Sequence, residues 1–237
     1  MTIIGIDSSG TTASVSVISD GKVLSALTQD TAYTHSRTLL PMVDNAIKMA
    51  DIKKEEIDLV AVANGPGSFT GLRIGAGTAK GLAMAFDTKI VEVPTLDALA
   101  FRLIYSDGLI CPIMNARRSQ VYTATYETVF ENEAYENPSL KEVLPMEAID
   151  IYELMDKLAG LGKKICFTGD GIEEFRETII NEFKAPFEFA PPHLSRQSAA
   201  SVALLGEKYY NQGRAIDIDK FKILYLRKSQ AEREKGL

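Results

Sequence analysis

A glycine-rich segment that follows a short apolar run constrains the fold of this chain more than any other feature. Residues 58–63 are predicted to form a strand, the loop 64–67 ends it, and a helix is expected to open at Ser68. Glycine destabilises a helix by about 1 kcal/mol relative to alanine, so four glycines in this helix cost roughly 4 kcal/mol. They are Gly71, Gly75, Gly77 and Gly81. Close packing against another part of a protein must offset this cost.

Small residues recur at every fourth position of the same helix and form a ridge. The ridge consists of Gly71, Gly75, Ala79 and Ala83. Such a ridge lets a second helix approach closely. The sequence leaves open whether the ridge packs against the helix expected over residues 37–50 or against a pair of helices from a partner. The helix over 37–50 has an apolar face of about half its circumference, wider than the stripe of about 100° typical of packing on one core. The extra width indicates a second contact.

The rest of the chain alternates strands and helices in two similar halves. The first half is expected to contain strands at 2–7, 13–19, 22–28 and 89–93, a helix with Ser36 as its N-cap, and a helix at 95–105. The second half is expected to contain strands at 109–115, 120–126, 129–135, 140–144 and 163–168, and helices at 146–159, 172–183 and 195–212. These patterns predict an α/β protein of two lobes, each a mixed sheet with flanking helices. We place the boundary near Asp107-Gly108, with domains 1–107 and 108–237.

Composition narrows the class of partner and the compartment. A formal net charge of −6 argues against binding nucleic acid over a broad surface. Cys111 and Cys166 are the only cysteines, and each lies at an apolar run, as buried free thiols do, which fits a reducing compartment. The N-terminal residues lack a secretory signal pattern, and the apolar segment 71–86 carries two basic residues and falls short of a membrane span. We therefore expect a cytoplasmic protein without a membrane segment.

Two turns that follow strands are candidates for holding a nucleotide. Asp7, Ser8 and Gly10 form the first, and Gly169, Asp170 and Gly171 form the second. Small-residue turns with free backbone N–H groups bind phosphates, although the same residues also suit any tight turn. A cleft between two such turns resembles the actin, Hsp70 and sugar-kinase superfamily. An ATPase or kinase of that class is one alternative function, but Asp7 is its only well-placed carboxylate.

Five segments of the chain together resemble one protein family. They are IGIDSS, HSRTLLPMVD, NGPGSFTGLRIGAGTAKGLA, NARRSQVY and YLRKSQAERE. They are similar to the motifs of the TsaB family, also called YeaZ, and the string GPGSFTGLRIG is the most specific of them. The resemblance implies two actin-like lobes of the ASKHA or RNase H-like type, shared with the paralogue TsaD but without its active centre. Asn115 departs from the family pattern, in which an acid more often precedes Ala-Arg-Arg, so acid chemistry at this position is in doubt.

The resemblance also implies a function and partners. Members of the family bind TsaD and, with the ATPase TsaE, support transfer of a threonylcarbamoyl group to the adenosine beside the anticodon of tRNAs that read codons starting with A. The chain is then expected to be a non-catalytic subunit that forms a homodimer when alone, needs no cofactor of its own and contacts tRNA weakly or indirectly. ATP or ADP is expected at the partner interface.

By the same resemblance, the partner interface lies on the helices over 39–50 and 71–86. Its expected residues are Leu39, Leu40, Met42, Val43, Ile47, Gly71, Leu72, Gly75, Ala79 and Leu82. No metal site is expected, because a metal-binding pair of histidines one helical turn apart would need a second histidine where Leu39 follows His35. A metalloprotease, the other alternative, therefore lacks its ligands.

Overall fold

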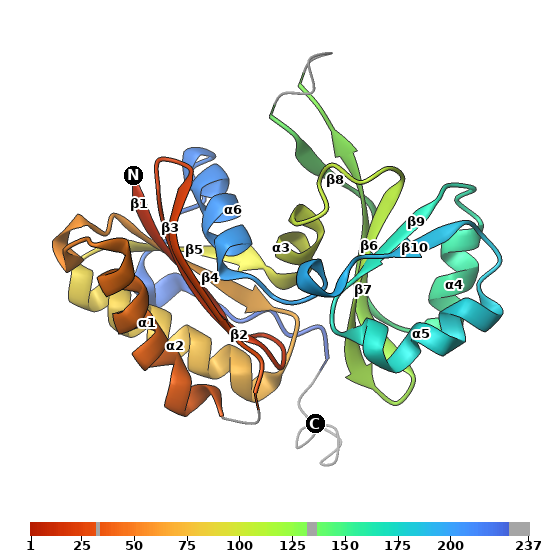
Figure 1. Ribbon diagram of the computed structural model, residues 1–237, viewed down its shortest axis with the longest axis horizontal. Coiled ribbons are helices and arrows are strands. Elements are labelled where there is room, and N and C mark those ends of the chain that lie inside the picture. The colour runs from red at the N-terminus through yellow and green to blue at the C-terminus, as the bar shows by residue number, and fades with distance from the viewer. Residues whose placement is uncertain (32–33, 132–136, 228–237) are drawn as a thin grey trace. The chain divides into compact units, whose positions relative to one another are not determined.

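The structure is a computed structural model that describes residues 1–31, 34–131 and 137–227 (Figure 1). The chain forms two compact units. The first contains Met1–Ala98 together with the segment from Gln197 onward, and the second contains Leu99–Arg196. Each unit has its own sheet and its own core, so each is described by itself.

The first unit is built on a five-stranded sheet with the strand order β3-β2-β1-β4-β5. Its strands are β1 (Thr2–Asp7), β2 (Ala13–Ser19), β3 (Lys22–Gln29), β4 (Leu59–Gly65) and β5 (Lys89–Pro94). β1, β2 and β3 form an antiparallel meander, whereas β4 and β5 run parallel to β1. All seven residues of β4 are buried, as expected for a central parallel strand covered on both faces.

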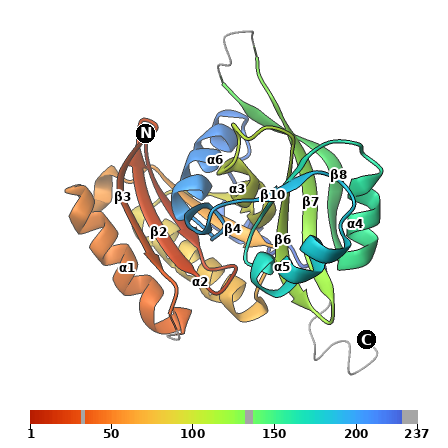
Figure 2. The same cartoon turned by 45° about the vertical axis from the view of Figure 1, so that its right-hand side comes forward.

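Helices cover both faces of this sheet (Figures 1 and 2). α1 (His35–Ala50) and α2 (Phe69–Phe86) lie side by side on one face, and α6 (Ala199–Asn211) lies on the other, against β1, β2 and β4. A short helical turn, η1 (Lys54–Glu56), follows α1. The core between the sheet and the two paired helices includes Ile4, Val15, Leu39 and Val60. α6 approaches the sheet so closely that a Cβ atom on Gly5 would overlap the Ala199 carbonyl oxygen.

The C-terminal segment after α6 crosses the edge and the end of the same sheet. Ile216 pairs with Ile90 of the edge strand β5. Beyond the short turn η3 (Ile218–Lys220), Phe221 is only 6% exposed, and the Leu224 amide donates to the Asn64 carbonyl oxygen at 2.8 Å. This segment therefore completes the first unit although it lies more than a hundred residues away in sequence.

The second unit has a five-stranded sheet with the order β10-β9-β6-β7-β8. Its strands are β6 (Leu109–Arg117), β7 (Gln120–Val129), β8 (Ser139–Asp150), β9 (Ile165–Thr168) and β10 (Phe187–Phe189). Its helical segments are α4 (Ile151–Ala159), α5 (Gly171–Glu182) and the turn η2 (Pro192–Leu194). The helix α3 (Thr95–Phe101) carries the chain from the first unit into the second. Four phenylalanines with ring centroids 5.4–6.2 Å apart fill the side of the core beside β9 and β10, and they are Phe167, Phe183, Phe187 and Phe189.

The structure differs from the sequence-based expectations in the division of the chain, in two elements and in one helix cap. The two units do not divide the chain at 107/108, because the chain from Gln197 onward packs on the first sheet and not with the domain 108–237. Residues 146–150 belong to β8 and are not helical. Val129, where a further strand over 129–135 is expected to begin, is instead the last residue of β7, and residues 132–135 lie outside the described part of the chain. Thr34, not Ser36, is the N-cap of α1. Among the described residues, no helix is both long enough and apolar enough to span a bilayer.

Candidate functional site

The turn between β1 and β2 is tightly bonded within itself. Asp7 is fully buried, and its carboxylate oxygen Oδ1 accepts hydrogen bonds from the Ser9 amide at 3.0 Å and from the Ser9 hydroxyl at 2.6 Å. This is the local bonding by which an aspartate closes a turn on the backbone two residues later. The same oxygen is therefore already used as an acceptor within the turn.

The N-terminal part of α2 covers this turn. The Ser8 hydroxyl donates to the Gly71 carbonyl oxygen at 2.9 Å, and the Ser68 amide donates to the Ser9 carbonyl oxygen at 2.7 Å. Ser8 is only 2% exposed. A Cβ atom on Gly71 would overlap the Ser8 carbonyl oxygen, and one on Gly75 would overlap the Ser8 hydroxyl. The glycines at 71 and 75 therefore let the helix lie directly on the turn.

This packing shows what the members of the glycine ridge contact within the chain. Gly71 and Gly75 contact the buried turn of their own chain, and Ala79 and Ala83 of the same ridge are fully buried. The ridge was expected to pack against α1 or against a partner helix. The ridge faces the interior of the first unit, where a Cβ atom on Gly71 would also lie 3.3 Å from the His35 ring at the start of α1. The contact with Ser8 offsets the cost of Gly71 and Gly75 but not that of Gly77 and Gly81, which face open space.

Two further groups close the remaining sides of the turn. The His35 ring nitrogen Nε2 lies 2.9 Å from the Gly10 carbonyl oxygen, and because a carbonyl only accepts, this nitrogen carries the proton. The side-chain amide of Gln197 is 1% exposed and occupies the space where a side chain on Gly10 would project. The Ser8 hydroxyl is already bonded to the Gly71 carbonyl oxygen, and the nucleotide-binding role of this turn stays a prediction.

In the second candidate turn, at Gly169–Gly171, both glycines pack closely against the neighbouring strand β6. A Cβ atom on Gly169 would overlap the Ile113 carbonyl oxygen of β6, and one on Gly171 would lie 2.8 Å from the same oxygen. Gly169 also has a positive φ of 103°, which other residues rarely adopt. Asp170 is the N-cap residue of α5. Packing on β6 explains both glycines without a ligand, and the nucleotide-binding role of this turn stays a prediction.

The expected interface residues divide into a buried majority and one exposed side chain. Nine of the ten are buried, while Leu40 of α1 is 60% exposed. The exposed face of α2 carries a different set that the ridge pattern missed, namely Arg73, Gly77, Gly81, Met84 and Ala85. Met84 is 73% exposed, and Cβ atoms on Gly77 and Gly81 would meet nothing within 4 Å. Their helical phase, opposite to Leu72 and Ala79, was the signal that could have identified them.

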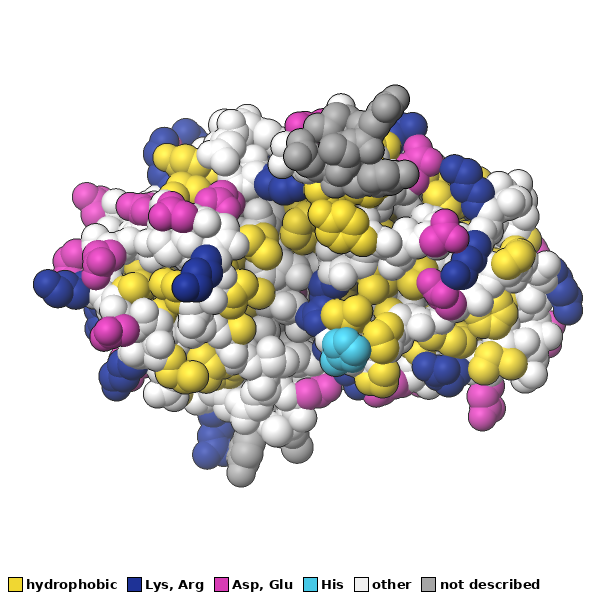
Figure 3. Space-filling model, turned by 45° about the horizontal axis from the view of Figure 1, so that its top comes forward, with side chains coloured by type: hydrophobic (Ala, Val, Ile, Leu, Met, Phe, Trp, Pro, Cys, Tyr) yellow, Lys and Arg dark blue, Asp and Glu magenta, His cyan; other side chains and the backbone are white. Residues whose placement is uncertain are grey.

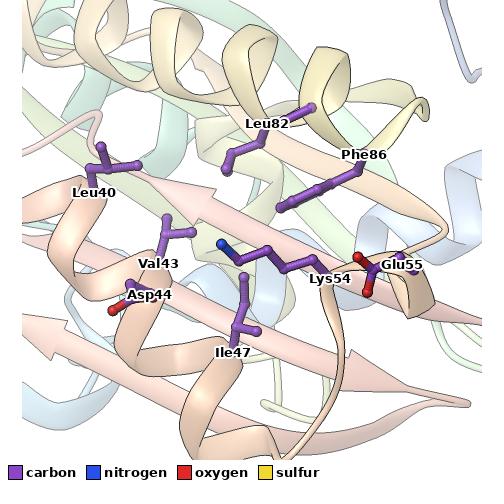
Figure 4. Close-up of a pocket in the computed structure, with 9 residues that line it drawn as sticks. Leu40, Val43, Asp44, Ile47, Lys54, Glu55, Leu82 and Phe86 are labelled. Carbon is purple, nitrogen blue, oxygen red and sulfur yellow. The ribbon is translucent and has the colours of Figure 1, made fainter.

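A groove of about 380 Å³ lies between α1 and α2 (Figure 4). Leu40, Val43 and Ile47 from α1 and Leu82 and Phe86 from α2 point toward one another across it. The side chain of Lys54 extends into the space between the two helices, and Asp44, Glu55 and Ala85 complete the lining. Asp44 has a lowered pKa because Lys48 donates a hydrogen bond to it. The groove thus has mainly apolar walls, with the Lys54 side chain extending into it.

Two observations concern metal binding and reactive thiols in the described part of the chain. Within residues 1–31, 34–131 and 137–227, no three His, Cys, Asp or Glu side chains gather closely enough to hold a metal ion. Burial raises the pKa of the Cys111 thiol to about 11, which keeps it protonated and poorly nucleophilic at neutral pH. On the face shown in Figure 3, basic and acidic side chains are interspersed, with no large patch of one sign.

Comparisons with known proteins agree with one another. The family model of TsaD, tRNA N6-adenosine threonylcarbamoyltransferase, matches residues 27–235. The "tRNA threonylcarbamoyladenosine biosynthesis protein TsaB" of Bacillus subtilis is 31% identical over 234 residues, which cover 98% of this chain and 96% of the relative. The Escherichia coli protein of the same description is 32% identical over 162 residues, 68% of each chain.

Solved structures show the same fold. YeaZ from Pseudomonas aeruginosa superposes with a TM-score of 0.73 at 21% identity, covering 95% of this chain and 99% of that one. A second Pseudomonas aeruginosa structure, described as similar to peptidase YEAZ, gives a TM-score of 0.78 at 21% identity with the same coverage. The expected α/β fold of two lobes, each a mixed sheet with flanking helices, is therefore confirmed, and YeaZ has the same fold.

Proposed function

Because the chain belongs to the TsaB family of tRNA threonylcarbamoyladenosine biosynthesis proteins, we propose that it is the non-catalytic docking subunit of this modification system. Its partner in this proposal is the threonylcarbamoyltransferase TsaD, with TsaE and ATP joining the complex. TsaD then performs the transfer to adenosine in tRNAs that read codons starting with A. The chain acts in the cytoplasm and pairs with a second copy of itself when TsaD is absent.

The observation that carries this proposal is the exposed face formed by α1 and α2. Large apolar side chains are exposed on it, at Leu40 and Met84, beside a groove lined by Val43, Ile47 and Leu82. Gly77 and Gly81 remove side chains from the exposed face of α2, so that a partner helix can approach its backbone. Apolar grooves next to closely approachable backbone suit a helical partner surface.

The hydrogen bonding and burial of the turn between β1 and β2 support the proposal that the chain is not catalytic. Asp7 is the carboxylate on which an actin-like kinase would depend, and it is fully buried and bonded to Ser9. Ser8 is covered by α2. Among the described residues, no observation favours a kinase or ATPase function, and none favours a metalloprotease.

The test is to replace Gly81 by leucine and to measure complex formation with TsaD. The leucine side chain would project into the docking face, so we expect the affinity for TsaD to fall at least about tenfold, equivalent to about 1.4 kcal/mol. The same change should raise the thermal stability of the chain, because leucine is the better helix former. Gly160→Leu is the matched control, since Gly160 is exposed just after α4 and its Cβ would make only ordinary contacts at 3.4 Å.

Masses from light scattering, with TsaD alone and with TsaD, TsaE and ATP, separate the outcomes. A heterodimer that forms with the wild type and the Gly160→Leu chain but not with Gly81→Leu supports the proposed face. An unchanged affinity for Gly81→Leu would show that docking uses another surface. Failure of the wild-type chain to bind TsaD under any of these conditions would remove the docking function itself.

A further inference from the structure

The turn between β6 and β7 has an unusual backbone. Arg117 pairs with Gln120, so Arg118 and Ser119 form a two-residue hairpin loop. Arg117, Arg118 and Ser119 have φ angles of 63°, 57° and 58°. Positive φ at both loop positions is typical of a type I′ hairpin turn. Three consecutive residues other than glycine thus occupy the left-handed region of backbone conformation.

The residues in this loop are poorly suited to its conformation. Type I′ turns strongly favour Asn-Gly or Asp-Gly, whereas this chain has Arg-Ser. A left-handed conformation costs about 1–2 kcal/mol for a residue with a Cβ atom. Arginine lacks the short polar side chain that makes this conformation tolerable for asparagine and aspartate. The identity of these residues therefore does not serve the stability of the turn, and residues that violate a local rule are often functional.

Surrounding contacts hold the backbone of the turn in place. The Asn115 side-chain oxygen accepts a hydrogen bond from the Arg117 amide at 2.7 Å, at the point where the pairing of β6 with β7 shifts register. The Ile151 amide at the start of α4 donates to the Ser119 carbonyl oxygen at 3.0 Å. Asn115, the residue that departs from the family pattern, thus has a structural role here. The backbone of the turn is fixed from both sides.

The two arginine side chains, in contrast, are exposed. Neither guanidinium forms an ion pair or a hydrogen bond with any residue in the described part of the chain. Adjacent guanidinium groups on a fixed backbone present forked donors that match the oxygens of phosphate groups. Because both side chains are exposed at the end of a hairpin, they suit the backbone of a macromolecule better than a small phosphate ligand.

We propose that Arg117 and Arg118 bind the phosphate backbone of an RNA. The inference rests on the proposed function, in which the complex acts on tRNA. The net charge of −6 and the interspersed charges in Figure 3 argue for a local contact and against a broad basic surface. Such a contact positions the RNA without reading its sequence.

The test exploits the mismatch between the loop residues and the turn. The double change Arg118→Asn with Ser119→Gly installs the favoured Asn-Gly turn and removes one positive charge. It should raise thermal stability and, if the proposal is right, weaken RNA binding by about tenfold, as expected for one charge-assisted contact. Lys184→Asn is the matched control, because Lys184 is exposed in the same unit and its loss changes the net charge equally. Arg118→Lys keeps the positive charge but loses the forked donors of the guanidinium, so its affinity for RNA should lie between those of the Asn-Gly variant and Lys184→Asn.

Affinity is measured by fluorescence anisotropy with an unmodified tRNA transcript between 50 and 200 mM salt, for the chain alone and for its complex with TsaD. A tenfold loss with a salt dependence reduced by about one charge, seen for the Asn-Gly variant and not for Lys184→Asn, supports the inference. Wild-type affinity and salt dependence in the Asn-Gly variant overturn it, as does a wild-type chain that binds no tRNA either alone or in complex.

Two other results separate this inference from the proposed function. If the Asn-Gly variant loses TsaD while tRNA binding is unchanged, the arginines contact an acidic protein surface and the RNA assignment is wrong. If wild-type TsaD complexes do not form, the docking proposal fails, while the tRNA titration of the chain alone still decides the role of the arginines.

Discussion

Single glycines in α2 have opposite roles although they share one helix. A Cβ atom on Gly71 would overlap the Ser8 backbone, whereas one on Gly77 would meet open space. Gly71→Ala is therefore expected to destabilise the first unit by about 1–3 kcal/mol through overpacking, and Gly77→Ala to stabilise it by about 1 kcal/mol through helix propensity. Urea unfolding of the two variants gives the comparison. Equal shifts of the two midpoints in the same direction would contradict the assignment of an inner and an outer face.

For single residues, the sequence shows that glycines destabilise the helix α2, but it does not show which contacts offset this loss of stability. Spacing identified a ridge at Gly71 and Gly75, and propensity required close packing around it. The neighbour proved to be the turn at Ser8 and Ser9, more than sixty residues earlier, which no local pattern specifies. Gly10 shows the same limit, because the side chain that covers it, Gln197, belongs to the far end of the chain.

The C-terminal segment is a structural element of the first unit even though it contains little regular secondary structure. Phe221 joins the core beneath α2, and Lys80 lies 5.5 Å from the centre of its ring. Phe221→Ala should cost about 3–5 kcal/mol, the usual loss for a buried phenylalanine. Tyr225→Ala on the same segment is the control, since Tyr225 is 41% exposed and should cost much less. Thermal unfolding of both variants tests this, and a loss for Phe221→Ala as small as that of an exposed residue would show that the segment does not contribute to the core.

Most elements were predictable because their patterns are strong, and the failures have physical causes. The apolar runs of β1, β2 and β4 and the periodicity of α1 and α5 matched the structure closely. Residues 146–150 were misassigned to a helix because the long edge strand β8 is half-exposed and lacks a clear alternation of apolar and polar residues. β10 was missed because three residues, Phe187–Phe189, carry too little pattern to be recognised.

The whole molecule consists of one continuous unit and one discontinuous unit. Residues 99–196 contain a complete sheet, its helices and its core, whereas residues 1–98 lack the helix that covers β1, β2 and β4. A fragment of residues 99–196 should therefore unfold cooperatively in urea, and a fragment of residues 1–98 should not. Circular dichroism can follow both transitions. Cooperative unfolding of the 1–98 fragment would show that α6 is dispensable for the first unit.

The late position of α6 sets the order in which the chain can fold as it leaves the ribosome. β1 and β2 are made first, yet Gly5, Ala61 and Val93, which face α6, remain uncovered until the 98 residues from Leu99 to Arg196 have been added. At typical elongation rates of about 5–20 residues per second, this delay is about 5–20 s. The second unit can close within that interval. The part of the protein that is synthesised first is thus completed last, and its open sheet is the surface that chaperones would meet during translation.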